Sequence, residues 1–210
     1  MTPSVSGIIL AGGRSRRLGI DKRSLSLRPH RTQIADTIER LGTIVDDLVV
    51  AGDPADLPPG RFTLVADDTV GVGPLAGIIA GLRAVQHDHA IVLACDLPFL
   101  NVDLLRGLLG LPRDYAMLVP VRADGTLEML HAVYGKSALN SLQTYLKAGE
   151  RRLAGLPAAC ARDGLAVRTV GEEWLREYDP ELRSFFNLNT PDDLKRAQDE
   201  LARCLRQQEV

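Results

Sequence analysis

The sequence lacks the features that mark membrane, secreted and zinc-stabilised proteins. No apolar run approaches the roughly 20 residues of a membrane-spanning helix, and the N-terminus has no basic segment typical of a secretory signal. The three cysteines, Cys95, Cys160 and Cys204, lie far apart and outside any CxxC pair, which predicts neither a disulfide framework nor a zinc site. With only 4% aromatic residues, the core must be mainly aliphatic. We therefore expect a cytoplasmic protein with no membrane contact.

The sequence also lacks a large excess of either positive or negative charge. The formal net charge of −2 argues against general nucleic-acid binding. The basic residues are nevertheless uneven, because one acid, Asp21, accompanies a basic cluster in residues 1–31: Arg14, Arg16, Arg17, Lys22, Arg23, Arg28 and Arg31. A basic cluster beside a glycine turn favours a polyphosphate ligand, and a solvated basic loop is the alternative of equal weight.

Strands alternate with helices along the first half of the chain. The sequence predicts strands at residues 7–11, 48–51, 62–66 and 90–94, and helices at 32–41, 74–85 and 102–109. The second half is less regular, with strands predicted at 117–121, 127–134 (antiparallel as an option), 165–170 and 185–188, and helices at 136–148 and after Thr190. This order predicts a single α/β domain over residues 1–210, with right-handed crossovers and a mostly parallel sheet.

A glycine-rich loop follows the first predicted strand, in the stretch LAGGRSRRLGIDK of residues 10–22. Gly12 and Gly13 allow the backbone to approach a ligand closely, and successive N–H groups form a concavity that binds anions. Arg17 and Lys22 would then neutralise a triphosphate. The loop matches neither the GxxxxGK[ST] nor the GxGxxG pattern, so the P-loop and the usual dinucleotide interpretations lose their main support.

Two aspartates follow predicted strands. Asp67 comes after the third strand, where open α/β sheets bind ligands, and would accept hydrogen bonds from a base or ribose. The alternative is a simple turn formed with Asp68. Asp96 follows the apolar fourth strand, where a carboxylate is costly without a cation or donors, so it is a candidate Mg²⁺ ligand. The alternative for Asp96 is a cap for the helix after Pro98, and its neighbour Cys95 is expected in the core.

Polar residues in the second half are candidates for binding a second ligand. Asn187 and Asn189 would lie on one face of the predicted late strand and offer amide groups, although Asn189 fits a helix-cap region equally well. His131 would reach the same ligand, but a lone histidine beside an apolar strand is more often structural.

Together these segments resemble the molybdenum cofactor guanylyltransferase family. The match runs from about Gly7 to Leu194 and includes LAGG-x-S-x-R-x-G-x-D-K, then GPLAGI, CDLP and FNLNTP in this order. The resemblance implies a three-layer Rossmann-like nucleotidyltransferase fold. It also implies an enzyme that transfers GMP from GTP to a molybdopterin-type cofactor with Mg²⁺, expels pyrophosphate, and has molybdoenzyme-delivery proteins as possible partners.

The resemblance also implies roles for single residues. The nucleotide would contact Leu10, Ala11, Gly12, Gly13, Lys22, Asp67 and Asp96, and the acceptor would contact Asn187 and Asn189. The catalytic set is then Lys22 and Asp96, to which the basic loop adds Arg17, and His131 joins the acceptor set on its own position in the sequence.

One departure from the family pattern concerns the position after the second strand. Relatives often carry an asparagine there, and this chain has Gly52 and Asp53. The alternatives are cytidylyl transfer to the same acceptor, nucleotidyl transfer to a sugar phosphate, and a non-catalytic nucleotide-binding module for cofactor delivery. The resembling cytidylyltransferase branch typically reads LAAG and has a glutamine after the metal aspartate. By this resemblance, Gly12-Gly13 and Asp96-Leu97 imply GTP in preference to CTP.

Overall fold

The computed structural model describes residues 4–11, 26–28, 31–52, 57, 60–66 and 73–208. Its main sheet has seven strands in the order β5-β4-β1-β6-β8-β7-β9. These strands are β1 (Ser6–Leu10), β4 (Asp47–Ala51), β5 (Thr63–Val65), β6 (His89–Ala94), β7 (Met117–Val121), β8 (His131–Gly135) and β9 (Val167–Gly171), and a separate ribbon pairs β2 (Ser26–Arg28) with β3 (Arg31–Thr32). Only β8 runs antiparallel to its neighbours, so the mostly parallel sheet is confirmed.

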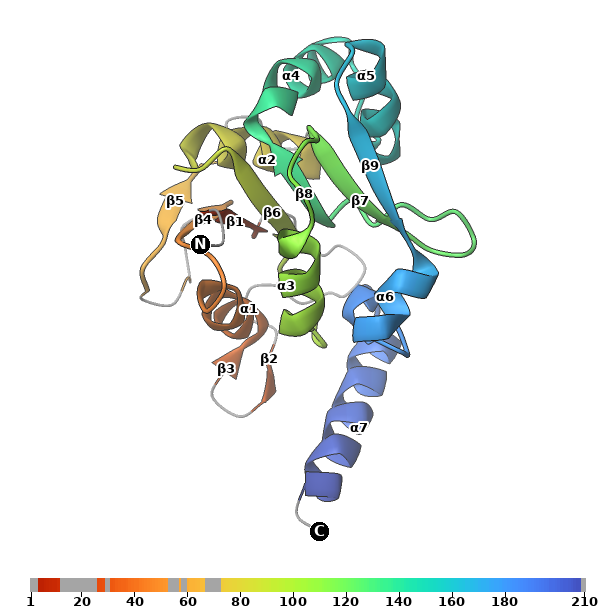
Figure 1. The fold of residues 1–210 in the computed structure, drawn as a ribbon. Coiled ribbons are helices and arrows are strands. Elements are labelled where there is room, and N and C mark those ends of the chain that lie inside the picture. Colours follow the sequence, from red (N-terminus) through yellow and green to blue (C-terminus); the bar gives the residue numbers. More distant parts are fainter. Residues whose placement is uncertain are drawn as a thin grey trace.

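Helices cover both faces of the sheet and make three layers (Figure 1). One face packs against α1 (Gln33–Gly42), α3 (Val102–Gly110) and α6 (Glu172–Tyr178), and the other against α2 (Pro74–Ala84), α4 (Leu139–Lys147) and α5 (Leu156–Arg162). Short 3₁₀ turns are η1 (Lys136–Ala138), η2 (Leu153–Gly155) and η3 (Arg183–Phe185), and α7 (Pro191–Gln208) extends away from the body (Figure 1).

Alternation along the central strands explains the two cores. In β1, Ile9 belongs to the cluster with α1 and α3, whereas Ile8 and Leu10 belong to the cluster with α2. In β6, Leu93 and Val92 divide between the faces in the same way. Because successive strand side chains point to opposite faces, a strand buried on both sides must be apolar throughout.

Helix α2 approaches the sheet closely through its glycines. A Cβ atom at Gly81 would lie 2.6 Å from Cγ2 of Ile8, and one at Gly77 would lie 3.0 Å from Cδ2 of Leu10. These two glycines therefore allow α2 to lie close to β1. Helix α2 begins after Gly73, whose φ of 91° is a left-handed value that favours glycine.

The predicted strand at residues 185–188 is wrong. A 3₁₀ turn occupies its start, because the Asp179 carboxylate accepts hydrogen bonds from the backbone N–H groups of Arg183 and Ser184. The N–H of Leu188 then donates to the backbone carbonyl of Asp96 at 3.1 Å instead of to a neighbouring strand. The two asparagines that follow Phe186 therefore do not share one face of a strand.

Other boundaries differ less. The predicted strand at 127–134 begins only at His131, and the antiparallel option for it is correct. The short helices α5 and α6 and the β2–β3 ribbon were not predicted. The final helix begins as expected, since Thr190 and Asp193 cap it reciprocally: the Thr190 N–H donates to Oδ2 of Asp193 at 2.9 Å, and the Asp193 N–H to Oγ1 of Thr190 at 3.2 Å.

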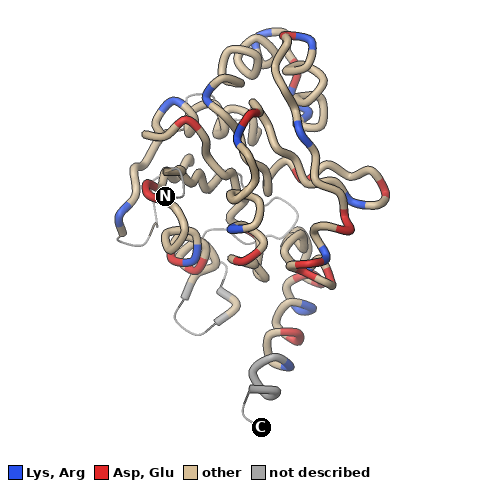
Figure 2. Tube along the Cα trace, viewed as in Figure 1, with Lys and Arg blue, Asp and Glu red and all other residues tan. Residues whose placement is uncertain are grey.

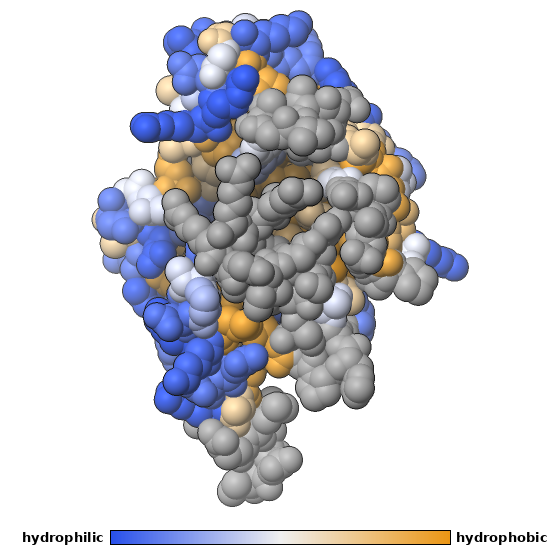
Figure 3. Space-filling model, turned by 180° about the vertical axis from the view of Figure 1, so that it is seen from behind, coloured by the Kyte–Doolittle hydropathy of each residue, from blue (hydrophilic) through white to orange (hydrophobic). Residues whose placement is uncertain are grey.

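Charged residues lie mainly on the outer helices and turns, and both signs mix along α7 (Figure 2). A small apolar cluster joins α7 to the body: Leu188 and Ala197 with the partly buried Leu27, Phe99, Phe186 and Leu194. Hydrophobic residues reach the surface beside α7 on the back of the molecule (Figure 3). In the part of the chain that the structure describes, no helix is both long and apolar enough to cross a membrane.

The contact between α2 and β1 predicts an unusual outcome for a glycine-to-alanine change inside a helix. We expect Gly81→Ala to lower the free energy of unfolding by about 1–3 kcal/mol, because displacing the buried Ile8 outweighs the gain in helix propensity of up to about 1 kcal/mol. Gly110→Ala is the control, since a Cβ there meets nothing within 4 Å. Urea unfolding of both variants measures the difference, and equal stabilities would contradict the close packing.

Candidate functional site

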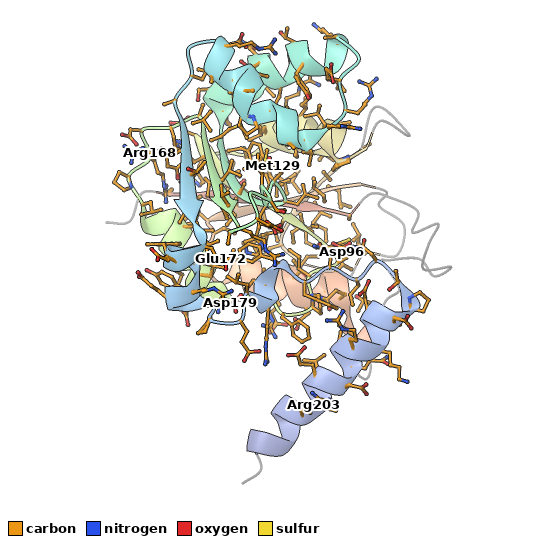
Figure 4. The ribbon with its side chains drawn as sticks, turned by 90° about the vertical axis from the view of Figure 1, so that its right-hand side faces the viewer. Asp96, Met129, Arg168, Glu172, Asp179 and Arg203 are labelled. Atoms are coloured by element: carbon orange, nitrogen blue, oxygen red, sulfur yellow. The ribbon has the colours of Figure 1, made fainter. Side chains whose placement is uncertain are left out.

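Asp96 lies at the centre of the carboxyl edge of the sheet. Strand β6, which ends two residues earlier, pairs with β1 on one side and β8 on the other. The Asp96 residue is 7% exposed, and in Figure 4 it lies near the middle of the molecule, far from Arg203 on α7. Helix α3 is capped by Asn101, whose side chain accepts from the N–H groups of Asp103 and Leu104. The alternative role of Asp96 as the cap of this helix is therefore wrong.

The loop between β6 and α3 is held from the side of α1. The Gln33 side chain donates to the Leu97 carbonyl at 2.7 Å, and Arg40 donates to the Leu100 carbonyl at 3.0 Å. Gln33 is itself buried, with 4% exposure. These bonds fix the backbone next to Asp96. Cys95 is buried in the core at 4% exposure, as predicted.

The predicted nucleotide segments leave the sheet on the β5 side of Asp96. Ala11 follows β1, and its N–H donates to the Ala51 carbonyl at 2.8 Å. Because the sheet uses this amide, a nucleotide contact by Ala11 would involve its carbonyl or its methyl group instead of its N–H. Leu10 is buried with 6% exposure. The other predicted nucleotide and catalytic residues lie outside the described residues: Gly12, Gly13, Arg17, Lys22 and Asp67, together with Asp53.

The segment between η3 and α7 passes directly beside Asp96. The hydrogen bond from Leu188 to the Asp96 carbonyl places Asn187 next to this site. Asn187 donates its side-chain amide to the Phe185 carbonyl at 3.0 Å, which orients its oxygen. Asn189 is exposed, and its N–H donates to the Asp193 carboxylate at 3.2 Å. The structure therefore separates the two asparagines and brings only Asn187 to the cavity described next.

A cavity of about 260 Å³ opens on the β8 side of Asp96. Four parts of the chain meet there: the loop after β6, the turn before β8, the segment at η2, and the end of η3 with the segment that follows it. The lining residues are Leu97, Leu127, Glu128, Met129, Leu130, His131, Leu153, Ala154, Phe185 and Asn187. Met129 and Asp96 are both near the middle of the molecule in Figure 4. Two of the predicted acceptor residues, His131 and Asn187, thus line one cavity.

His131 is a buried and neutral member of this wall. The residue is 1% exposed, and its ring packs against Phe185 with 4.9 Å between centroids. Neither ring nitrogen has a hydrogen-bond partner among the described residues. Burial lowers the pKa of His131 to about 4, and nearby Asp179 only partly opposes this shift. At neutral pH the ring offers one donor and one acceptor without charge.

Glu128 is the cavity residue that sequence analysis missed. Its side chain is 16% exposed, and Nη1 of Arg122 lies 3.7 Å from its Oε1. Burial raises the pKa of the Glu128 carboxyl, and Arg122 offsets this only partly. Its position in EMLHAVY, three residues before His131, was a usable signal, because an acid beside a buried strand needs a partner. Phe185 and Leu153 gave no such signal, since apolar residues are usually core.

The described residues suit a metal bound chiefly by substrate oxygens. Asp96 supplies one buried carboxylate, and the described ranges hold no group of three or more His, Cys, Asp or Glu able to bind a metal ion. Mg²⁺ usually takes one or two carboxylates and completes its shell with phosphate oxygens and water. A single strand-end aspartate fits this preference if a polyphosphate ligand supplies the other oxygens.

Comparisons with known proteins agree in pointing to one family. The family described as MobA-like NTP transferase domain matches residues 7–162. A molybdenum cofactor guanylyltransferase from Desulfosudis oleivorans is 35% identical over 93% of this chain and 95% of its own. A relative from Chloroflexus aggregans, with the same activity in its name, is 41% identical over 92% and 93%. The solved molybdopterin-guanine dinucleotide biosynthesis protein A from Archaeoglobus fulgidus has a TM-score of 0.78 at 30% identity, over 94% of this chain and 99% of its own.

The depressed pKa of His131 predicts a pH dependence of stability. Between pH 6.5 and about 4 the unfolded chain binds a proton at this histidine and the folded chain does not. The free energy of unfolding must therefore fall as the pH falls through this window, by up to about 3 kcal/mol from this group. His131→Phe removes the titration and keeps an aromatic ring. Urea unfolding at pH 7 and 4.5 should show a smaller loss in the variant, and an equal loss would refute the assignment.

Proposed function

Since this chain belongs to the MobA-like NTP transferase family, we propose that it transfers GMP from GTP to a molybdopterin-type cofactor and releases pyrophosphate. The observation that supports the proposal is the position of Asp96 after the central strand β6, between the strands that lead to the predicted nucleotide loops and the cavity. The predicted nucleotide loops follow β1 and β5 on one side, and the cavity with His131 and Asn187 lies on the other. Such an arrangement suits the joining of two bound substrates.

The proposed reaction is an in-line attack by the acceptor's terminal phosphate oxygen on the α-phosphorus of GTP. A new P–O bond forms as the bond to the β-phosphate oxygen breaks, and pyrophosphate leaves with the electron pair. The attacking phosphate is already ionised near pH 7, so the chain needs no general base. Its main task is to hold two anions together and to stabilise charge on the leaving group.

The chain's own residues divide this task. Asp96 would hold Mg²⁺, which when bound supplies Lewis acidity and a template for phosphate oxygens. Lys22, Arg17 and the amides of Gly12 and Gly13 would stabilise the triphosphate. The hydrogen bond from Gln33 to the Leu97 carbonyl and the one from the Leu188 N–H to the Asp96 carbonyl keep the backbone around Asp96 in place. Delivery proteins for the product are further expected partners.

Nucleotide binding tests the assignment of Asp96. Calorimetric titration with GTP, CTP, ATP and UTP in Mg²⁺ should give selective GTP binding, and Asp96→Asn should weaken it about tenfold or more, because the metal loses its carboxylate. Asp103→Asn is the matched control, since the Asp103 side chain is 77% exposed on α3. Selectivity for CTP would move the enzyme to the cytidylyl class. Absence of any nucleotide binding would refute the proposal.

The rate of pyrophosphate release tests the role of the glycine-rich loop and distinguishes an enzyme from a module that only binds the nucleotide. Lys22→Ala should reduce pyrophosphate release at saturating substrates by roughly 10²–10³-fold, as the loss of one preorganised donor commonly does. Lys147→Ala, at the exposed end of α4, should leave the rate unchanged. Near-normal turnover of the Lys22 variant would show that this lysine does not act on the transition state. No release from the wild type would favour the delivery module.

A further inference from the structure

The cavity beside Asp96 has apolar walls and one charged lining residue. Leu127, Met129, Leu130 and Leu153 supply aliphatic surface, and Glu128 is the acidic residue of the lining. Such walls with a few placed polar groups are typical of a site for a flat organic ligand.

The Glu128 carboxylate is not fully stabilised by the protein groups described. Nη1 of Arg122 lies 3.7 Å from Oε1 of Glu128, which is longer than a good hydrogen bond. The Arg122 side chain is also 39% exposed, so solvent weakens its charge. Burial disfavours the charged form of Glu128, as its raised pKa indicates. A ligand that donates two N–H groups would stabilise the carboxylate in the geometry that carboxylates accept best.

His131 provides a second and independent indication of a ligand. It is buried, it lines the same cavity, and its ring nitrogens have no partner within the described residues. Leaving such groups unsatisfied is costly, and a bound ligand with a donor and an acceptor would satisfy them. The Glu128 carbonyl accepts from the His131 N–H at 3.1 Å, so one turn carries both residues.

We propose that Glu128, with His131 beside it, recognises the amino-pyrimidinone edge of the acceptor's pterin. The N3–H and one 2-amino hydrogen would donate to the carboxylate, and His131 would bond another heteroatom of the ring. This inference rests on the proposed function for the identity of the acceptor. It assigns Glu128 a role in specificity, not in the chemical step.

Charge sets the direction in which the acceptor lies. The acceptor's phosphate is repelled by Glu128, so we expect it to point away from this residue and toward the Asp96 end of the site, where Leu97, the chain neighbour of Asp96, also lines the cavity. That end is where the proposed Mg²⁺ and the α-phosphate of GTP meet. Recognition at Glu128 therefore orients the nucleophile for the in-line attack.

Guanine carries the same amino-pyrimidinone edge as a pterin, so the two sources have to be distinguished. The sheet order separates them, because the predicted nucleotide segments follow β1 and β5, whereas Glu128 precedes β8 on the far side of β6. We therefore assign the pterin to this cavity and place the guanine on the other side of Asp96.

Two small heterocycles test the assignment: pterin, and lumazine, which has a carbonyl in place of the 2-amino group. Fluorescence titration of the full chain should show pterin binding about tenfold or more tightly than lumazine, since a carbonyl facing the carboxylate is repelled. In Glu128→Gln this preference should vanish or invert, because an amide complements the N3–H and the 2-carbonyl of lumazine. Glu150→Gln, exposed and outside the cavity, should keep the wild-type preference.

GTP titration of the same proteins separates this inference from the proposed function. We expect GTP to bind the wild type and Glu128→Gln equally, which also shows that the variant is folded, and not to displace pterin. If GTP binds but the pterin preference is the same in Glu128→Gln, the role of Glu128 is refuted. If Glu128→Gln weakens GTP and GTP displaces pterin, the cavity is the guanine site and the inference is overturned. Failure of GTP binding in the wild type refutes the proposed function itself.

Discussion

Strand β6 is the element on which the arrangement of this site depends. It pairs in parallel with β1 and antiparallel with β8, and both of its faces are buried. Because β6 is the fourth of the seven strands, its carboxyl end lies in the middle of the sheet edge. Ligands bound on the β1 side and on the β8 side can therefore both contact the residue that follows it. Asp96 occupies that position. The reversal of direction at β8 brings the start of β8, with Glu128 and His131, to the same edge as the end of β6.

Burying the polar groups near this edge of the sheet costs free energy of folding. Glu128 is half-buried and His131 is buried, in a cavity lined largely by Leu, Met and Phe. A carboxylate or imidazole in such surroundings destabilises the folded chain unless a ligand, a cation or a donor compensates. Stability and binding are therefore coupled here, since ligands that satisfy these groups also stabilise the fold.

Much of the fold was predictable because its local signals agree with the tertiary structure. The apolar runs of β1, β4 and β6 and the amphipathic α1 were identified within a few residues. The prediction of a strand at 185–188 failed because the carboxylate of Asp179, six residues before this segment begins, accepts backbone hydrogen bonds and so stabilises a turn. The short α5 and α6 gain their stability from packing on the sheet, which no local pattern reveals. For the candidate site, the sequence predicted Asp96, Asn187 and His131, and the structure places Asn187 and His131 in the cavity and Asp96 beside it, whereas the sequence did not indicate Glu128.

What the sequence determined by itself was the family, the α/β class and the residue types that follow each strand, because motifs and hydrophobic periodicity are local properties of the chain. The comparisons confirm the resemblance to molybdenum cofactor guanylyltransferases on which that assignment depended. Only the tertiary structure decided that Glu128, His131, Phe185 and Asn187 line one cavity, and that Asn189 does not. These residues come from segments about sixty positions apart, and only sheet order and strand direction bring such segments together.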